Sequence, residues 1–261
     1  MLAAADEQLS LTDPDARSMA TSGRGTGLVG YNVQTAVDTR HHLIVAHEVT
    51  NVGHDRTQLA TMSQQAKAAI GAGQLKVVAD RGYFKGEELK ACEDDQVETY
   101  LPKPQTSGAQ AEGRFGKREF IYHADADEYE CPAGERLIRR METTEGGLKL
   151  FRYWTSVCRQ CPLKPQCTSG KERRITRWKH EDVVERAQAR LEQHPEMMRI
   201  RRRTVEHPFG TIKGWMGSQH FKTKTLPHVG TEMSLHVLAY NLKRVIGLFG
   251  VPELIRKMRA A

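Results

Sequence analysis

Between residues 31 and 102 the sequence alternates strand patterns with helix patterns, and this order constrains the fold more than any other feature. Apolar residues repeat with a period of two in YNVQTAVD (31–38), and HHLIVAHEVT (41–50) follows after a Thr-Arg turn. The connection is too short for a helix. The two segments therefore predict an antiparallel hairpin.

Helix, strand, helix and strand patterns follow the hairpin. Helix formers dominate 57–70, with apolar residues near helical spacing and glycines directly after them. β-Branched residues then predict a strand that ends at Asp80, a helix is expected over 86–95, and a short strand follows at 97–102. Strands that are joined through helices are usually parallel, so we predict an α/β fold.

Changes in composition divide the chain into four segments. Residues 1–27 are small and polar without sustained periodicity, so we expect a poorly ordered lead-in that contains no strand. A polar, glycine-rich stretch with short strand patterns indicates an inserted, mainly β subdomain, and helical patterns return from Glu181. The predicted segments are the lead-in (1–27), the first part of a core (28–104), the insertion (105–195) and a helical part that completes the core (196–261). Four apolar residues of the last helix pattern share one face: Leu235, Leu238, Leu242 and Ile246.

The bulk properties restrict the compartment and the partners. No apolar run approaches the roughly 18 residues of a membrane-spanning helix, and the first residues carry acids where a secretory signal has a basic and then an apolar region. We therefore expect a cytoplasmic protein without a membrane partner. The 39 Lys and Arg residues exceed the 32 Asp and Glu residues, and the net charge of +7 is compatible with a nucleic-acid partner.

Asp80 is the first candidate for chemistry. It ends the strand pattern KVVAD and is followed by Arg81, Gly82 and Tyr83. The carboxyl end of a strand in an α/β sheet is the usual edge of an active site. The alternative is a turn residue that caps the following helix, and the motif alone favours this alternative.

Glu206 is the second candidate, because it is the single acid in a basic stretch. Seven Lys and Arg residues lie between Arg199 and Lys224. Arg202 precedes Glu206 by one helical turn and Lys213 follows it by nearly two, so the three side chains can share a helix face. The alternative is an ordinary solvated ion pair, but Pro208 marks a kink or a helix start close by.

A strand-end aspartate and a helical glutamate among basic residues suit phosphoryl chemistry with divalent cations. Two Mg²⁺ ions about 4 Å apart need carboxylate oxygens from several acids. Arginine and lysine side chains then hold the phosphates. This combination makes Asp80 and Glu206 candidate metal ligands, with Arg202 and Lys213 on phosphate.

Four of the five cysteines form a cluster, Cys131, Cys158, Cys161 and Cys167. One C-x₂-C pair with two further thiols is a credible structural Zn²⁺ site, in which His123 or His180 could replace one ligand. The alternative is a set of small buried apolar residues. Bound zinc would help to fold a polar insertion that is too small to support itself.

Several motifs together resemble the bacterial insertion-sequence transposases of the DDE type, whose catalytic core is an RNase H-like fold. The resemblance covers nearly the whole chain, and the joint order of the motifs is more specific than any one of them. The motifs are TDPDARSM (12–19), GYNVQTAVD (30–38), ADRGY (79–83), ECPAGERL (130–137), CRQCPLKPQC (158–167), RRRTVEHPFGTIK (201–213) and LAYNLKRV (238–245).

The resemblance implies an RNase H-like core with an inserted Cys-containing subdomain, and DNA at the element ends and at the target as the partner. It implies that Asp80 is the second metal-binding acid and Glu206 the third, with Mg²⁺ or Mn²⁺ as cofactor. A homo-oligomer is implied when two ends are brought together. Arg199 occupies a position where the family often has a tyrosine, and it could still bind phosphate.

The sequence departs from the family pattern at its beginning. The family's first catalytic acid lies on a strand before the TDPDAR segment, and only 11 residues precede that segment here. We therefore expect an amino-terminally shortened transposase with weak or no catalysis by this chain alone. The alternatives are a catalytically inactive DNA-binding remnant and, less favoured, a zinc-stabilised nucleic-acid-binding module without a cleavage role.

Overall fold

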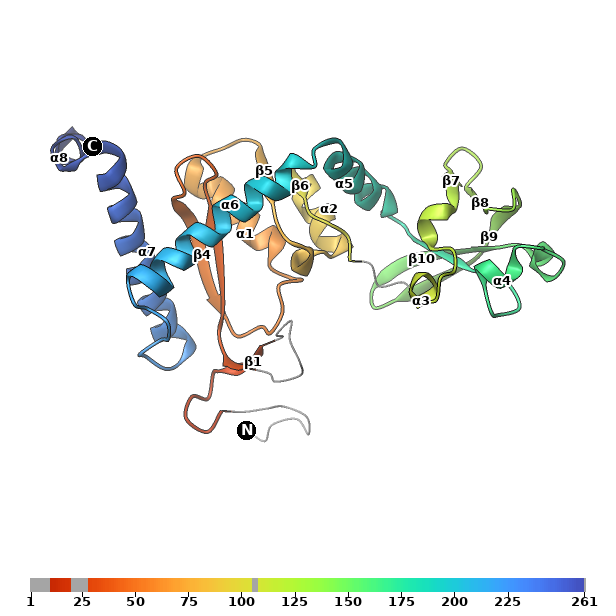
Figure 1. Ribbon diagram of the computed structural model, residues 1–261, viewed down its shortest axis with the longest axis horizontal. Helices are drawn as coiled ribbons and strands as arrows, with labels where there is room; N and C mark the ends of the chain where they lie inside the picture. The colour runs from red at the N-terminus through yellow and green to blue at the C-terminus, as the bar shows by residue number, and fades with distance from the viewer. Residues whose placement is uncertain (1–9, 20–27, 105–107, 261) are drawn as a thin grey trace. The chain divides into compact units, whose positions relative to one another are not determined.

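The computed structural model describes residues 10–19, 28–104 and 108–260 and divides the chain into two compact units (Figure 1). The first unit combines the residues up to Lys103 with those from Val183 onward, and the second is Pro104–Asp182. Helices and sheets occur together, so the predicted α/β class is confirmed at that level.

The predicted hairpin is present in the first unit. β3 (Asn32–Val37) pairs antiparallel with β4 (Ile44–Thr50), and a register shift follows Ala36. The predicted helix is α1 (Leu59–Ile70), which ends at Gly71 with φ of 64°. A left-handed residue at this position is the usual way to stop a helix and favours glycine.

The second strand pair of the first unit is parallel, as predicted. β5 (Leu75–Val78) pairs in register with β6 (Val97–Tyr100), and η1 (Arg81–Tyr83) and α2 (Gly86–Asp94) connect them. Within the described part of the chain, β3 and β4 form one two-stranded sheet and β5 and β6 another. Helix α1 contacts strands of both sheets, so it is their common support.

The lead-in contains a strand that we did not expect. β1 (Arg17–Met19) pairs antiparallel with β2 (Leu28–Gly30), and residues 1–9 and 20–27 lie outside the described part. Before β1, the buried Asp13 carboxylate accepts hydrogen bonds of 2.8 Å from the Tyr31 hydroxyl and 3.2 Å from the Thr225 amide. These long-range bonds order a segment that has no hydrophobic periodicity.

The second unit ends earlier than the insertion that we predicted to extend to residue 195. Helix α5 (Glu181–Gln193) has three buried residues between Val183 and Ala187. Its Gln188 side chain donates to the Leu101 carbonyl at 3.1 Å and accepts from the Lys103 amide at 3.3 Å. These bonds join α5 to the end of β6, so most of the helix belongs to the first unit.

The carboxyl-terminal part of the first unit is helical, as predicted. α6 (Glu196–Gly210) contains Pro208, and the π-helical η4 (Thr211–Trp215) follows it directly. α7 (Leu226–Phe249) and α8 (Val251–Ala260) complete the chain. Among the described residues, no helix is both long enough and apolar enough to span a membrane.

Helix α7 packs through a different face from the one that its leucines mark. Val229, Met233, Val237 and Tyr240 are buried. Leu238, by contrast, is 63% exposed, and the other residues of the leucine face are exposed as well: Leu235, Leu242 and Ile246. The buried face packs on the hairpin, in a cluster that includes Ile44 and Ile212.

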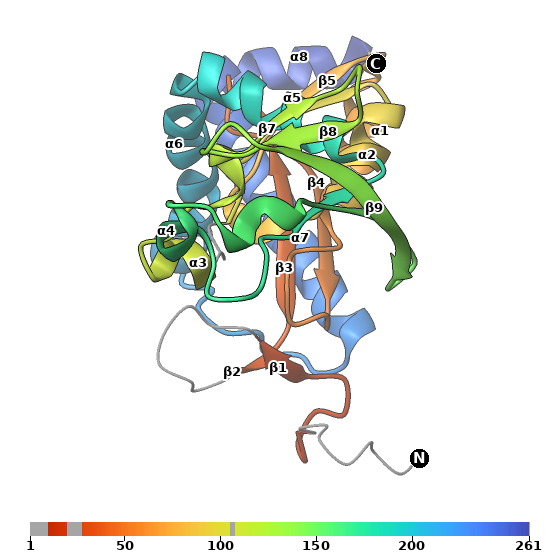
Figure 2. The same ribbon diagram turned by 90° about the vertical axis from the view of Figure 1, so that its right-hand side faces the viewer.

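The second unit is a five-stranded antiparallel sheet in the order β11-β10-β9-β8-β7, with the long, curved β9 in its middle (Figure 2). Its core contains Phe120, Tyr129, Leu137, Tyr153 and Ile175. The mainly β character that we predicted for this region is thus present. The strands are β7 (Ile121–His123), β8 (Glu128–Glu130), β9 (Arg136–Glu145), β10 (Leu148–Trp154) and β11 (Ile175–Trp178). The short helices are α3 (Gly108–Ala111), η2 (Lys117–Glu119), η3 (Ser156–Arg159) and α4 (Lys164–Cys167).

Asn241 of α7 bonds to the backbone of β4, and this contact yields a prediction. Its carboxamide accepts from the Ile44 amide at 2.9 Å and donates to the Ile44 carbonyl at 2.8 Å. Asn241→Ala leaves both backbone groups unpaired and is expected to lower the free energy of unfolding by about 1–3 kcal/mol, measured by urea denaturation. Leu242→Ala, at a neighbouring exposed position, is the control and is expected to change stability little. Equal effects of the two substitutions would contradict this role of Asn241.

Candidate functional site

Asp80 lies just beyond the end of β5 and caps η1. Its Oδ1 accepts a hydrogen bond of 2.8 Å from the Gly82 amide. A β-carbon on Gly82 would lie 2.9 Å from the same oxygen, so a side chain at this position would displace the Asp80 carboxylate. The capping alternative is therefore correct as a description of Asp80, and it leaves the second carboxylate oxygen free for another partner.

That partner is Arg201 of α6. Its Nη2 donates to Asp80 Oδ2 at 2.9 Å, and both side chains are partly exposed. We predicted a phosphate-binding role for the adjacent Arg202 and did not single out Arg201. In a helix, neighbouring residues differ by about 100° in direction, so a pattern of spacings without the tertiary structure does not decide which of two adjacent arginines faces β5. Arg202 is exposed.

A polar network that includes Asp55 lies beside Asp80. Asp55 Oδ1 accepts from the side chains of Asn32 and Gln34, at 2.8 Å each. The other oxygen of Asp55, Oδ2, lies close to Gly82, as does Asp80 Oδ1. A β-carbon built on Gly82 would be 3.4 Å from the first oxygen and 2.9 Å from the second. Two carboxylates thus approach each other at the end of β5. Sequence reasoning missed Asp55, whose only local signal is its place in the loop NVGHD after the hairpin.

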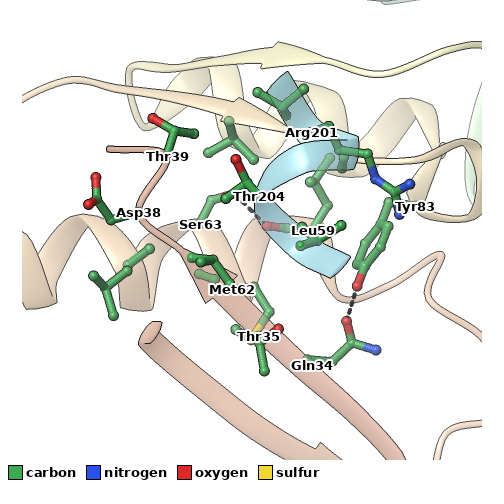
Figure 3. A pocket seen from close by; sticks show the side chains of 18 of the residues that line it. Gln34, Thr35, Asp38, Thr39, Leu59, Met62, Ser63, Tyr83, Arg201 and Thr204 are labelled. Carbon is green, nitrogen blue, oxygen red and sulfur yellow. Dashed lines mark hydrogen bonds between the residues drawn. The ribbon is translucent and has the colours of Figure 1, made fainter. Parts of the chain in front are cut away.

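Tyr83 completes this network. Its hydroxyl donates to the Gln34 side-chain carbonyl, and Gln34 is 1% exposed (Figure 3). Burial raises the pKa of Tyr83 well above its ordinary value, and the negative charges of Asp55 and Asp80 raise it further, while Arg201 opposes them. Tyr83 therefore remains a neutral hydrogen-bond donor over the physiological range.

The network opens into a cavity of about 970 Å³ in the first unit. Strands β3 and β5 and helices α1 and α6 line it. Figure 3 shows side chains of β3, α1 and α6 around it. Asp55, Asp80 and Glu206 all lie on its walls, together with Arg201. Glu206 is exposed, and it comes from α6, one helical turn and one residue beyond Arg201.

The remaining residues that we predicted to bind phosphate lie on the surface. Arg199 and Arg202 of α6 are exposed. Lys213 is exposed in the π-helical η4, with its ammonium 5.6 Å from the centre of the Phe209 ring. The π-helical turn begins between Glu206 and Lys213, and Pro208, which cannot donate a backbone hydrogen bond, lies just before it.

The carboxylates fit a divalent cation in chemical type but not in arrangement. Mg²⁺ and Mn²⁺ prefer oxygen ligands such as those of Asp80 and Glu206. Both oxygens of Asp80 are, however, engaged by Gly82 and Arg201. In the part of the chain that the structure describes, no three Asp, Glu, His or Cys side chains are arranged to hold a metal ion.

The four clustered cysteines surround one small cavity in the second unit. The cavity has a volume of about 20 Å³, and Cys131, Cys158, Cys161 and Cys167 all line it. Burial raises the pKa of the Cys167 thiol, Arg173 opposes this, and the other three cysteines add to the increase. His123 instead bonds to Glu130 at 3.2 Å, and His180 lies against Trp178.

Comparison with known proteins identifies the family. The sequence model described as Transposase DDE domain matches residues 6–242, and the chain therefore belongs to this family. Membership supports a transposase function and implies DNA as a partner. Divalent metal ions are the general cofactors of such domains. No curated protein and no solved structure gives a significant match.

The Tyr83–Gln34 bond yields a prediction about stability and pH. Tyr83→Phe removes the donor to a buried carbonyl and is expected to lower the free energy of unfolding by about 1 kcal/mol at pH 7. Because the pKa of Tyr83 is raised in the folded protein, its contribution is complete below pH 10, where unfolded tyrosine begins to ionise, and decreases as pH rises further. The difference between the two proteins should therefore shrink above about pH 10 in urea titrations. A constant difference across this range would show that Tyr83 does not titrate in this way.

Proposed function

We propose that this chain is the catalytic domain of an insertion-sequence transposase, which hydrolyses phosphodiester bonds at element ends and joins the freed 3′ hydroxyl to target DNA in the cytoplasm. The observation that carries this proposal is that Asp80 and Glu206, far apart in sequence, line one cavity of a chain that belongs to the DDE transposase family. Asp80 and Glu206 would bind Mg²⁺ or Mn²⁺, and an RNase H-like core would hold them.

The arrangement of Asp80 also supports low activity in this chain. Arg201 places a positive guanidinium against the Asp80 carboxylate, so a cation would have to compete with this ion pair for the same group. Asp55 is a further carboxylate at the same place, but its Oδ1 already accepts two hydrogen bonds. We therefore propose that strand transfer by this chain alone is weak or absent.

The second candidate function is a catalytically inactive, DNA-binding remnant. The Asp80–Arg201 ion pair favours it, because the arginine already neutralises the carboxylate that a catalytic metal ion would use. In both candidates Arg199, Arg202 and Lys213 bind DNA phosphates from exposed positions. In the active form, two copies of the chain would hold two element ends together.

An assay of DNA binding and strand transfer on the same proteins tests these proposals. Single alanine substitutions at Arg199, Arg202 and Lys213 should each weaken DNA binding. Each should also reduce the slope of the logarithm of the binding constant against the logarithm of the salt concentration by about one, which corresponds to one lost phosphate contact. Lys90→Ala is the matched control, because Lys90 is paired with Asp94 on α2. If the control weakens binding as much as the three substitutions, the assigned DNA surface is wrong.

Strand transfer with Mg²⁺ or Mn²⁺ then separates the two candidates. Any activity of the unaltered chain should be lost in Asp80→Asn and Glu206→Gln, with DNA binding retained. Activity that survives either substitution would exclude the proposed roles of these acids. Unaltered DNA binding without any activity would favour the inactive remnant.

For the second unit we propose a structural Zn²⁺ ion held by Cys131, Cys158, Cys161 and Cys167. The support is that four thiols from four positions in the sequence line one cavity beside the hydrophobic core of that unit. Thiolates are the preferred ligands of structural zinc. The four side chains are not arranged to hold an ion in the structure as described, so they would have to rotate to bring the sulfur atoms to about 2.3 Å from it. The ion would join the segment after β8 to η3 and α4.

Metal analysis of the purified protein tests this site. We expect one zinc per chain, and a decrease in zinc content in Cys158→Ser and Cys161→Ser, together with a lower melting temperature. Cys92→Ala is the control, because Cys92 is buried in the first unit beside Ser63. A protein that is fully folded without zinc and indifferent to chelators would contradict the proposal.

A further inference from the structure

Helix α7 has an apolar face that is exposed in the described part of the chain. Five residues form this face: Leu235, Leu238, Leu242, Ile246 and Phe249. Successive residues of a helix differ by about 100° in direction, which places all five within about 40° of Leu242. The buried residues Val237 and Tyr240 point to the opposite side of the helix. In Figure 1, α7 lies at the left-hand edge of the first unit.

The exposed area of this face is large for a protein that works as a monomer. Leu238 is 63% exposed and Phe249 is 50% exposed. The five side chains together present about 500 Å² of apolar surface, which is near the upper end of what monomeric proteins leave uncovered. Val251, two residues beyond Phe249, continues the exposed apolar surface onto α8. Two such faces would bury about 1,000 Å² against each other, which reaches the lower limit of a specific interface.

The residues of the face are arranged symmetrically about Leu242. Leu238 and Ile246 lie four positions before and after it, and Leu235 and Phe249 lie seven positions before and after it. A two-fold axis beside Leu242 would therefore bring Leu238 of one copy next to Ile246 of the other. A self-complementary interface needs such a pattern, because residue i of the first copy contacts residue j of the second, and j of the first contacts i of the second.

Smaller residues at matching positions allow two such helices to approach closely. Ala239 and Val245 lie three positions before and after Leu242, so they would face each other across the same axis. Large side chains beside small ones interdigitate when two helices pack. All seven positions hold apolar residues. Lys243, at the border of the face, has its ammonium 5.5 Å from the centre of the Trp215 ring.

We propose that two copies of this chain associate through α7, with the two helices antiparallel and a two-fold axis beside Leu242. Antiparallel helices also place opposite ends of their dipoles next to each other. A parallel pair would bring each residue next to its own copy and would not need a sequence that is symmetrical about one position. The face also covers only about two heptads, fewer than a parallel coiled coil usually has.

The chemistry of the face favours a second copy over DNA or a lipid surface. Phosphates require cations, and the seven residues of the face supply none. A helix that lies on a membrane usually has Lys and Arg along its polar side. Here Ser234 and Asn241 border one side of the face, and Glu232 and Lys243 border the other, so the border has no excess of positive charge. The association requires no DNA and goes beyond the proposed transposase function.

Sedimentation velocity of the full chain without DNA tests the association. The unaltered chain should change from monomer to dimer between about 1 and 100 µM, because a small interface binds weakly. Leu238→Glu and Ile246→Lys should each raise the dissociation constant at least about tenfold, since each buries a charge without a partner. Ile121→Glu is the control, at an exposed position of β7 in the second unit, and should dimerise like the unaltered chain.

The double variant Leu238→Glu/Ile246→Lys tests the direction of the helices. In an antiparallel pair each introduced carboxylate faces an introduced ammonium of the other copy. The dissociation constant should therefore return to within about threefold of the unaltered value and increase with salt concentration. In a parallel pair like charges would meet, and the association would stay lost. Urea midpoints at about 0.5 µM, where the chain is monomeric, show whether each variant is folded.

Three outcomes would overturn the proposal. They are a chain that stays monomeric at about 100 µM, dimerisation that neither single substitution weakens, and a double variant that does not recover. Co-flotation of a monomeric chain with phosphatidylglycerol vesicles, lost in Leu238→Glu, would assign the face to a lipid surface. Because no DNA is present, the result is independent of whether the chain has any transposase activity.

Discussion

The hydrogen bonds around Gln34 are the interaction on which the arrangement of the candidate site depends. The hairpin and the parallel strand pair share no ladder hydrogen bonds in the described part of the chain. They are related through the common support of α1 and through the bonds that Gln34 makes with Asp55 and Tyr83. A buried amide with partners in two other segments permits few other arrangements, because each lost bond leaves a buried polar group without a partner.

The electrostatics of the site follow from the same geometry. Asp55 and Asp80 bring two negative charges to the end of β5, and Arg201 from α6 is the cation that compensates Asp80. This ion pair links α6, and with it Glu206, to the strand end. This ion pair competes with any cation for the Asp80 carboxylate, so the position of α6 affects how available that carboxylate is.

Most of the local structure could be predicted from the sequence, because it depends on short-range patterns. The alternation over 31–50 predicted the hairpin, and the β-branched run before Asp80 predicted a parallel strand. The TDPDAR segment could not be interpreted in this way, since its role is long-range. Asp15 accepts from the Leu226 amide at 2.8 Å and so caps α7 from more than 200 residues away. The leucine face of α7 was equally misleading, because periodicity identifies an apolar face without showing which face has a partner.

The sequence by itself determined the class of fold, the family, and the chemical identity of the candidate residues Asp80 and Glu206. Only the tertiary structure decided that Arg201, and not Arg202, pairs with Asp80, that Asp55 joins the site, and that the leucine face of α7 stays exposed. The physical reason is the range of the interactions. Propensity and periodicity act over a few residues, whereas ion pairs, buried hydrogen bonds and the covering of a helix face depend on segments that only folding brings together.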